Sequence, residues 1–489
     1  MDVYGKLIEA TKRWPNREAI FSQGRWITFS ELLDMVERLI GGLHAKGMKE
    51  GEKLAICLPN SIGYISLLIA SMAAGLIVVP LDPTYRKDDL LRVISHGKIE
   101  YLFTYRPMDL PGIKQEIEIQ DFNSLLDHRR KKGVAWEDDR LAMILYTSGT
   151  TGTPKGVPYT FKQLSSPIDV LRHFGLQDDM ERLLCHVPLS HLGGIVHLLM
   201  TLCFGSRLVL GERFIPRTLV REIQEHQITA LLLPPNAIEA SLLSTKCDPQ
   251  ALSTLRLIVY FGAPGREGLI EDIEKTFPHV KAITGWGLTE STAPIVILPK
   301  ELPAEIRYRK GIVGKPCPWV EIGIIDDEGN RLGPEKEGEI IVKGWPIMKG
   351  YYNAPELTKE VLKDGWLYTG DLGFVDKDGF LYISGRKKEV IIVGGLKVNP
   401  TDIEAILKEH PKINDAAVIG VKDRIRGEVV KAFIVPSDKS LNKKEVIAFC
   451  RKRLPGYKVP RYVEFIDAIP RTSSGKIKRK ALQERHESF

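Results

Sequence analysis

The sequence predicts an α/β protein in which a large N-terminal domain is followed by a smaller one. Up to about residue 310, helix-length stretches alternate with short apolar runs, the pattern of sheets covered by helices. From Gly311 to Gly385, short alternating segments separated by Asp-Gly turns predict a small β-barrel-like subdomain. Beyond Arg386 the pattern becomes α+β. We therefore expect domains at residues 1–385 and 386–489.

The buried strands of the large domain are expected at apolar runs bounded by turn residues. These runs are residues 54–58, 141–145, 183–187, 230–233 and 257–261. Two longer uncharged stretches, 61–80 and 195–210, are each divided by a glycine into a helix-length piece and a strand-length piece. The first is about long enough to span a bilayer, but the helix–glycine–strand order is typical of a buried α/β core. We expect no transmembrane segment.

Composition indicates a globular protein with more than one domain. The 489 residues are too many for one core, and 43% hydrophobic residues exclude a disordered chain. The six cysteines are scattered and form no CxxC pair, which argues against a disulfide framework and a structural zinc site. Neither end of the chain resembles a secretory or peroxisomal signal. These features together predict a cytoplasmic protein.

The charge balance favours a small anionic ligand over a nucleic acid. Basic residues outnumber acidic ones by 69 to 62, and many of them lie near the C-terminus. The aromatic residues that stack on bases are missing there, whereas ATP or CoA explains the same charge. We assign Arg471, Lys478, Arg479 and Lys480 to the solvated surface.

A Gly/Thr-rich loop follows the predicted strand 141–145 and suits a polyphosphate. It offers free backbone N–H groups, hydroxyls and one ammonium. The expected phosphate-binding residues are Thr147, Ser148, Gly149, Thr150, Thr151, Gly152 and Lys155. The P-loop of nucleoside triphosphatases requires GxxxxGK[ST], whereas here Lys155 comes three residues after Gly152. That class is excluded, and an ordinary Gly/Thr turn is the alternative.

This loop and further motifs, in this order, resemble the AMP-forming acyl-CoA synthetases, the superfamily that includes luciferases and peptide-synthetase adenylation domains. The motifs are Trp286-Gly-Leu-Thr289-Glu290, Tyr368-Thr-Gly-Asp371, Gly385-Arg386-Lys-Lys388-Glu and Pro470-Arg-Thr-Ser-Ser-Gly-Lys476. The resemblance covers nearly the whole chain. It implies an N-terminal AMP-binding domain and a mobile C-terminal lid that turns about Lys388. It also implies ATP, Mg²⁺ and CoA as cofactor and co-substrates, with cleavage of ATP to AMP and pyrophosphate.

The resemblance assigns roles in nucleotide binding. Glu290 would bind Mg²⁺, although it could instead be an acid at a helix N-terminus. Asp371 would accept hydrogen bonds from both ribose hydroxyls, and Arg386 would contact ribose or phosphate. Adenine is expected between Gly262-Ala263-Pro264 and Trp286. Most relatives carry tyrosine at position 286, so here stacking is retained but a phenol hydrogen bond is lost.

The catalytic residues implied are Lys476, Thr289, Glu290 and His191. Lys476 would reach the attacking carboxylate and the α-phosphate, supplying charge as the transition state forms. Gly395, from a Gly-Gly turn, and the nearby Lys397 would line the pantetheine tunnel after the lid has turned. His191 would lie at the acyl side of that tunnel, or be a buried structural histidine.

The acyl substrate is expected to be apolar, because Gly262 and the segments 191–194, 234–236 and 291–293, which flank the nucleotide motifs, are small or apolar. We favour a medium- or long-chain fatty acid, with o-succinylbenzoate or another aryl acid as the alternative. An enzyme that loads a carrier protein would share these motifs. A catalytically silent nucleotide-binding protein is disfavoured because Glu290, Asp371 and Lys476 are all present. Monomer and homodimer both stay open.

Overall fold

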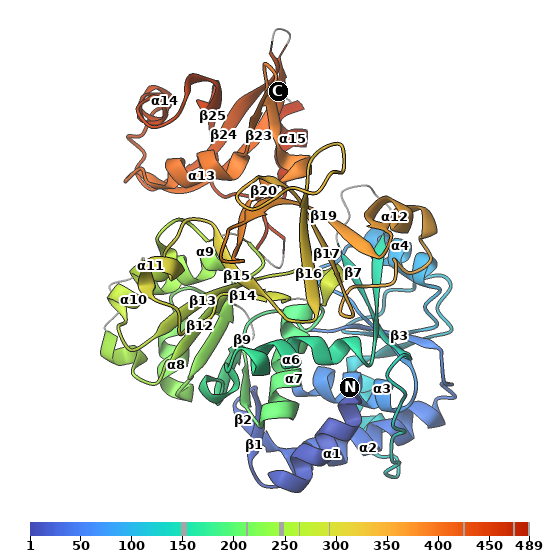
Figure 1. The fold of residues 1–489 in the computed structure, drawn as a ribbon. Coiled ribbons are helices and arrows are strands. Elements are labelled where there is room, and N and C mark those ends of the chain that lie inside the picture. Colours follow the sequence, from blue (N-terminus) through green and yellow to red (C-terminus); the bar gives the residue numbers. More distant parts are fainter. Residues whose placement is uncertain are drawn as a thin grey trace.

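The computed structural model describes residues 1–147, 154–211, 214–243, 249–263, 265–292, 294–423, 426–472 and 475–487. Their strands form three sheets, of fourteen, six and five strands. Figure 1 shows the five-stranded sheet and its helices as a separate C-terminal layer above the rest of the molecule. The predicted fold class, a large α/β domain followed by a small α+β domain, is confirmed.

The six-stranded sheet has the order β6-β5-β3-β4-β7-β8 and is parallel except for β8. Its strands are β3 (Lys53–Cys57), β4 (Ile77–Pro80), β5 (Tyr101–Thr104), β6 (Gln115–Glu118), β7 (Leu141–Thr147) and β8 (Lys155–Thr160). The helices of this part are α1 (Val3–Arg13), α2 (Phe29–Ala45), α3 (Ile62–Ala73), α4 (Lys87–Gly97) and α5 (Phe122–Leu126). Thr147 and Lys155 pair across β7 and β8, so the ends of the predicted phosphate loop lie side by side.

The fourteen-stranded sheet is parallel from β1 to β13, in the order β1-β10-β9-β11-β12-β13. These strands are β1 (Glu18–Ser22), β9 (Arg182–Cys185), β10 (Arg207–Leu210), β11 (Ala230–Leu233), β12 (Leu257–Tyr260) and β13 (Lys281–Trp286), with β2 (Arg25–Thr28) at the edge. The helices of this part are α6 (Ser166–His173), α7 (Leu192–Phe204), α8 (Leu219–His226), α9 (Pro235–Ile238), α10 (Leu269–Thr276) and α11 (Ala304–Arg307).

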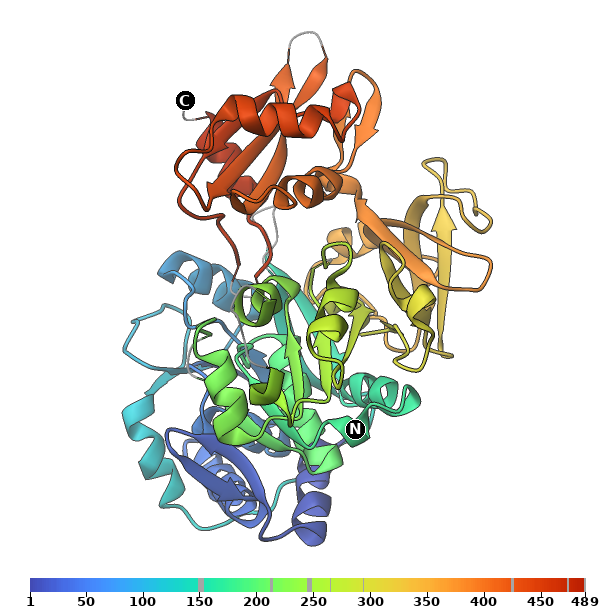
Figure 2. The ribbon, with the colours of Figure 1, turned by 90° about the vertical axis from the view of Figure 1, so that its left-hand side faces the viewer.

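The predicted β-rich subdomain continues the same sheet through antiparallel pairs instead of forming a separate sheet. Its elements are β14 (Val296–Ile297), β15 (Ile312–Pro316), β16 (Val320–Ile325), β17 (Gly338–Gly344), α12 (Pro355–Val361), β18 (Leu362–Lys363), β19 (Trp366–Val375) and β20 (Leu381–Arg386). Figure 2 shows this region projecting to one side of the parallel strands, beneath the C-terminal layer.

The two uncharged stretches form the predicted helix–glycine–strand units. Helix α3 and strand β4 are separated by Gly75 at φ +85°, and α7 and β10 by Gly205 at φ +70°. Glycine has no Cβ and therefore adopts this left-handed conformation at a helix end with little steric cost. Both helices are buried along most of their length, which explains their uniform apolarity. Within the described parts of the chain, no helix is both long and apolar enough to cross a bilayer. The cytoplasmic location stays a prediction.

The C-terminal sheet has the order β22-β21-β24-β23, with β25 beside β24. Its elements are β21 (Ile391–Val393), β22 (Leu396–Val398), α13 (Pro400–Lys408), β23 (Ile413–Asp423), β24 (Gly427–Pro436), α14 (Lys443–Arg451), β25 (Tyr462–Phe465) and α15 (Arg479–Glu487). Val418 of β23 packs in one apolar cluster with Ile403 of α13, and the next residue, Ile419, packs in another with Leu482 of α15. Because successive side chains of a strand point to opposite faces, α13 and α15 cover the two faces of this sheet.

Candidate active site

Several predicted site residues lie after the carboxyl ends of neighbouring parallel strands. His191 comes after β9, Pro234 follows β11, Gly262 and Ala263 come after β12, and Trp286 ends β13. Ligands of open α/β sheets bind along this edge. Gly262 has φ +82°, which favours glycine, and an added Cβ would meet no atom within 4 Å. The predicted residues Ser148, Gly149, Thr150, Thr151, Gly152 and Pro264 fall outside the described residues.

Asp371 is held at two points. Its Oδ2 accepts a hydrogen bond from the Trp286 indole at 2.9 Å, and its Oδ1 pairs with Nε of Arg386 at 2.7 Å. Asp371 and Arg386 also face each other in register between β19 and β20. Burial raises the pKa of Asp371, while Arg386 and the indole N–H oppose that rise. Each carboxylate oxygen accepts more than one hydrogen bond, so both can still accept ribose hydroxyls.

Trp286 therefore has a polar contact that the sequence did not indicate. Sequence reasoning left this side chain only a stacking role, yet its indole N–H donates to Asp371. The residues are 85 apart and lie on β13 and β19, which β14, β15 and β20 separate within one sheet. No local sequence signal could have revealed this contact.

Glu290 and Thr289 lie in the short 3-10 helix η6 (Thr289–Ser291), which follows β13. Tyr159 donates a hydrogen bond to the Thr289 carbonyl at 2.6 Å, and the Met348 amide donates to the Glu290 carbonyl at 2.8 Å. The Glu290 carboxylate accepts a hydrogen bond from the Tyr351 hydroxyl at 2.8 Å. Glu290 also lies in the first turn of η6, where the alternative of a helix N-terminal acid places it, so that alternative stays open beside the metal role.

The surroundings of Glu290 fit a cation held mainly by a nucleotide. No ion pair engages this carboxylate among the residues that the structure describes. Those residues also contain no cluster of three or more His, Cys, Asp or Glu that could form a complete protein metal site. Mg²⁺ is usually held by one or two carboxylates together with phosphate oxygens and water. One carboxylate without a cationic partner meets that requirement.

Lys476 lies on a loop of the small domain that approaches the large one. A Cβ built on Gly475 would be 3.4 Å from Oδ1 of Asn236 and 3.6 Å from Cβ of Pro234. Lys476 as a whole is exposed to solvent, while desolvation of its ammonium, together with the charge of Arg386, lowers the pKa of Lys476. Asp371 and Glu290 oppose the change. The predicted catalytic lysine thus shares an electrostatic environment with the predicted nucleotide residues.

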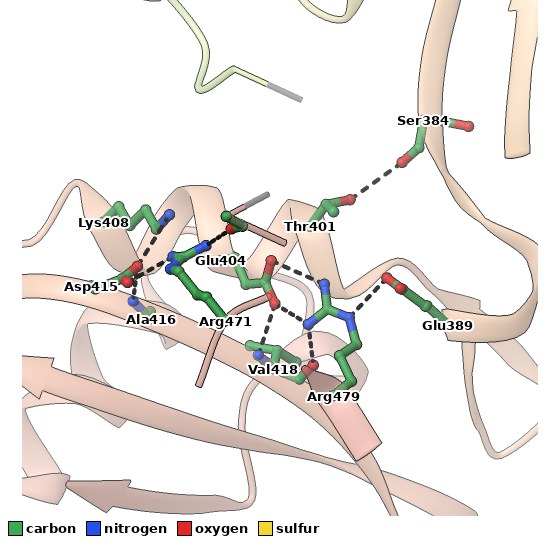
Figure 3. Close-up of polar contacts among 11 residues, drawn as sticks. Ser384, Glu389, Thr401, Glu404, Lys408, Asp415, Ala416, Val418, Arg471 and Arg479 are labelled. Atoms are coloured by element: carbon green, nitrogen blue, oxygen red, sulfur yellow. Dashed lines mark hydrogen bonds and ion pairs between the residues drawn. The ribbon is translucent and has the colours of Figure 1, made fainter. Parts of the chain in front are cut away.

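Arg471 and Arg479 do not lie on the solvated surface to which the sequence analysis assigned them. Arg479 donates to Oε2 of Glu389 at 2.8 Å, to both carboxylate oxygens of Glu404 and to the Val418 carbonyl (Figure 3). Arg471 donates to Asp415 at 2.7 Å and to the Gly475 carbonyl at 2.9 Å. The assignment was wrong because these residues flank Lys476 and anchor its loop to the small domain.

His191 precedes α7 and lies near a carboxylate that the sequence analysis missed. Its Nε2 is 3.6 Å from Oδ2 of Asp82, whose side chain is 4% exposed, whereas that of His191 is 30% exposed. The His191 side chain is therefore only partly buried, and its place at the acyl side of the tunnel stays a prediction. Asp82 follows β4 of the other sheet, so its place after a predicted strand was the available signal.

Gly395 and Lys397 are not brought together with the other predicted residues. They belong to the turn and strand after β21, where Gly395 has φ +83° and an added Cβ would meet no atom within 4 Å. Lys397 pairs with Asp327 at 2.7 Å, and both side chains are exposed. Ile392 and Leu396 beside them are exposed apolar residues. No contact of the described residues joins this turn to Asp371, Glu290 or Lys155.

Two family models match the chain, one for the AMP-binding enzyme over residues 7–352 and one for the AMP-binding enzyme C-terminal domain over residues 402–476. The chain belongs to the AMP-binding enzyme family. The resemblance inferred from the ordered motifs is therefore confirmed.

Similar proteins include CoA ligases of two substrate classes. A 2-succinylbenzoate–CoA ligase of Bacillus licheniformis is 31% identical over 99% of this chain and 100% of its own length. A long-chain-fatty-acid–CoA ligase of Yersinia pestis is 30% identical over 99% of this chain and 95% of its own length. The structure of o-succinylbenzoate CoA synthetase from Bacillus subtilis with the acyl-adenylate intermediate matches with a TM-score of 0.87 and 29% identity, covering 98% of this chain and 97% of that one.

The enzyme class follows from the family and these homologues. This AMP-binding enzyme is an ATP-dependent, AMP-forming acid–thiol ligase, as the motifs predicted. The homologues divide between fatty-acid and o-succinylbenzoate ligases, so they do not select between the two predicted acids.

Proposed function

We propose that this ligase activates an apolar carboxylic acid in two steps. The carboxylate attacks the α-phosphorus of ATP to give acyl-AMP and pyrophosphate, and the thiol of CoA then displaces AMP. The first step is supported by the ion pair of Arg386 with Asp371 at 2.7 Å and by the loop of Lys476, which approaches Pro234 and Asn236 beside the sheet edge. An anion attacking a polyanion needs fixed positive charge, and Lys476 and Arg386 supply it.

Each residue of the nucleotide site has a proposed role. Asp371 binds the ribose hydroxyls, Gly262 and Trp286 flank the adenine, and Lys155 binds phosphate together with the loop 147–152. Glu290 holds Mg²⁺, which screens the phosphate charge when bound. Thr289 contributes to the same turn. A solved structure of the o-succinylbenzoate CoA synthetase of Bacillus subtilis contains ATP and a magnesium ion, which supports this choice of ligands.

The second step requires a different lid orientation. We propose that the lid, residues 386–489, turns about Lys388 and replaces Lys476 with the Gly395 turn. The exposure of Lys388, Ile392 and Leu396 supports this, since such surface is available for contacts in another orientation. A turn of two glycines admits the narrow pantetheine arm close to the backbone. Lys397 would assist CoA binding, and His191 would face the thioester-forming end.

For the acid, we propose a medium- or long-chain fatty acid. Among the described residues of the predicted acyl wall, 191–194, 234–236 and 291–292, there is no lysine or arginine to bind a second carboxylate. The second candidate is o-succinylbenzoate or another aryl acid. This candidate is supported by the similarity of the chain to the 2-succinylbenzoate–CoA ligase of Bacillus licheniformis, which aligns over 489 residues and 100% of its length. Free CoA, not a carrier protein, is the proposed acceptor.

The test is a panel of saturated fatty acids, benzoate derivatives and o-succinylbenzoate, scored by AMP release with and without CoA. The proposal expects kcat/KM to be highest for a fatty acid and thioester to form only with CoA. Preference for o-succinylbenzoate by more than tenfold would select the second candidate. If neither the fatty acids nor the aryl acids caused AMP release, both candidate substrates would be contradicted.

A further inference from the structure

Tyr351 contacts two of the residues that we propose to bind the metal and the phosphates. Its hydroxyl donates to Oε1 of Glu290 at 2.8 Å. The ammonium of Lys155 lies 5.5 Å from the centroid of its ring, within the range of a cation–π contact. Glu290 follows β13 of the fourteen-stranded sheet, whereas Lys155 begins β8 of the six-stranded sheet. Tyr351 therefore connects proposed functional residues of two separate sheets.

The backbone around Tyr351 is bound to the same two places. The Met348 amide donates to the Glu290 carbonyl, and the Tyr352 amide donates to the Gly156 carbonyl, each at 2.8 Å. Tyr351 itself is 8% exposed, and its amide donates to the Thr358 hydroxyl at 2.9 Å. A side chain fixed in this way loses little further freedom when its hydroxyl orients a carboxylate.

We propose that Tyr351 is a positioning residue that orients Glu290 toward Mg²⁺ through its hydroxyl and holds Lys155 toward the phosphates through its ring. This rests on the metal role proposed for Glu290. The Tyr351 hydroxyl donates to Oε1 of Glu290. Within the described parts of the chain nothing hydrogen-bonds to Oε2 of Glu290, so Oε2 is available as a metal ligand. A phenol suits this position because it fixes a carboxylate without neutralising it, whereas a lysine would compete with the metal.

The test measures nucleotide binding instead of turnover. The affinity of the uncleavable analogue α,β-methylene-ATP is determined by calorimetry in excess Mg²⁺ and in EDTA, for the wild type and for Tyr351→Phe, Tyr351→Leu and Glu290→Gln. Tyr308→Phe is the matched control, because the Tyr308 hydroxyl donates to a carboxylate oxygen of Glu274 at 2.9 Å outside this site. Thermal unfolding of every variant checks its folding.

In the wild type, Mg²⁺ should increase the affinity for the analogue relative to EDTA. In Tyr351→Phe this increase should be about tenfold smaller, the usual effect of removing a partner behind a metal ligand. The affinity of Tyr351→Phe in EDTA should equal that of the wild type. Tyr308→Phe should bind the analogue as tightly as the wild type both in Mg²⁺ and in EDTA. Tyr351→Leu should bind several-fold more weakly than Tyr351→Phe in EDTA, because the contact with Lys155 is lost as well.

Two results would overturn the proposal while sparing the site. One is that Mg²⁺ raises the affinity of Tyr351→Phe as much as that of the wild type, although Glu290→Gln has lost this increase. The other is equal weakening of Tyr351→Phe in Mg²⁺ and in EDTA, which would indicate a structural role only. An unchanged Mg²⁺ effect in Glu290→Gln would instead overturn the metal role of Glu290, and the proposal with it.

Discussion

Replacing Arg479 by methionine should destabilise the C-terminal domain strongly, because it leaves the buried carboxylate of Glu404 without a cationic partner. The Arg479 and Glu404 side chains are 15% and 9% exposed, and the guanidinium also reaches Glu389 and the Val418 carbonyl. Removing one partner of a buried pair costs about 3–5 kcal/mol. Methionine retains the bulk of the apolar stem, so packing changes little.

Hydrogen exchange of the C-terminal domain, measured by mass spectrometry, is the appropriate assay, since a protein of several domains need not unfold in one step. The predicted loss corresponds to exchange in β23 and β24 faster by about 10² to 5 × 10³-fold. Arg485→Met is the control, because Arg485 is 49% exposed and, among the described residues, pairs only with Glu464, at 2.7 Å. Such a surface pair contributes about 0–1 kcal/mol.

A double variant separates lost charge pairing from lost packing. Glu404 also accepts a hydrogen bond from the Val418 amide at 2.8 Å, and glutamine retains that acceptor without the charge. Arg479→Met with Glu404→Gln should therefore recover roughly half of the loss. If Arg479→Met exchanged no faster than Arg485→Met, or if the double variant were worse than the single one, the buried-charge explanation would be refuted.

Three further outcomes follow from the site. Trp286→Phe should raise the KM for ATP about tenfold, because it removes a hydrogen bond to a charged group, and it should leave the KM for the acid unchanged. The control is Trp319→Phe, which removes an indole N–H that has no partner among the described residues. This control should change neither KM. We propose that Lys476 acts in its protonated form, and its pKa is lowered, so kcat/KM for ATP should fall with rising pH earlier than an ordinary lysine would allow. Lys476→Arg should move that fall to higher pH, and the same alkaline limb in both proteins would contradict this. The nucleotide product should be AMP, and ADP as the main product would exclude attack at the α-phosphorus.

Much of the site could be predicted because its residues follow strands that are recognisable from sequence. The run 257–261 predicts β12, which ends at Tyr260, and the run 230–233 coincides with β11, so the residues after them lie along one sheet edge. The run 183–187 extends beyond β9, which ends at Cys185, because a short apolar run does not mark its own end.

The contacts that sequence reasoning missed depend on packing between distant segments. Tyr351 reaches Glu290 across 61 residues, and Arg479 reaches Glu404 across 75. A basic residue near a C-terminus is more often exposed than buried, so Arg479 gave no signal of its partners. Asp82 was the exception, because it follows a predicted strand and could have been included.

The central claim is that one lid serves the two half-reactions with different residues, and single-turnover kinetics test it most directly. Lys476→Ala should lose adenylation by roughly two to three orders of magnitude while converting supplied acyl-AMP and CoA to thioester. Gly395→Leu should form acyl-AMP and stall, since its added side chain meets nothing in the present orientation. Gly379→Leu is the control for backbone strain, because Gly379 has φ +82° in an equally open turn. Equal impairment of both steps in both site variants would contradict the account.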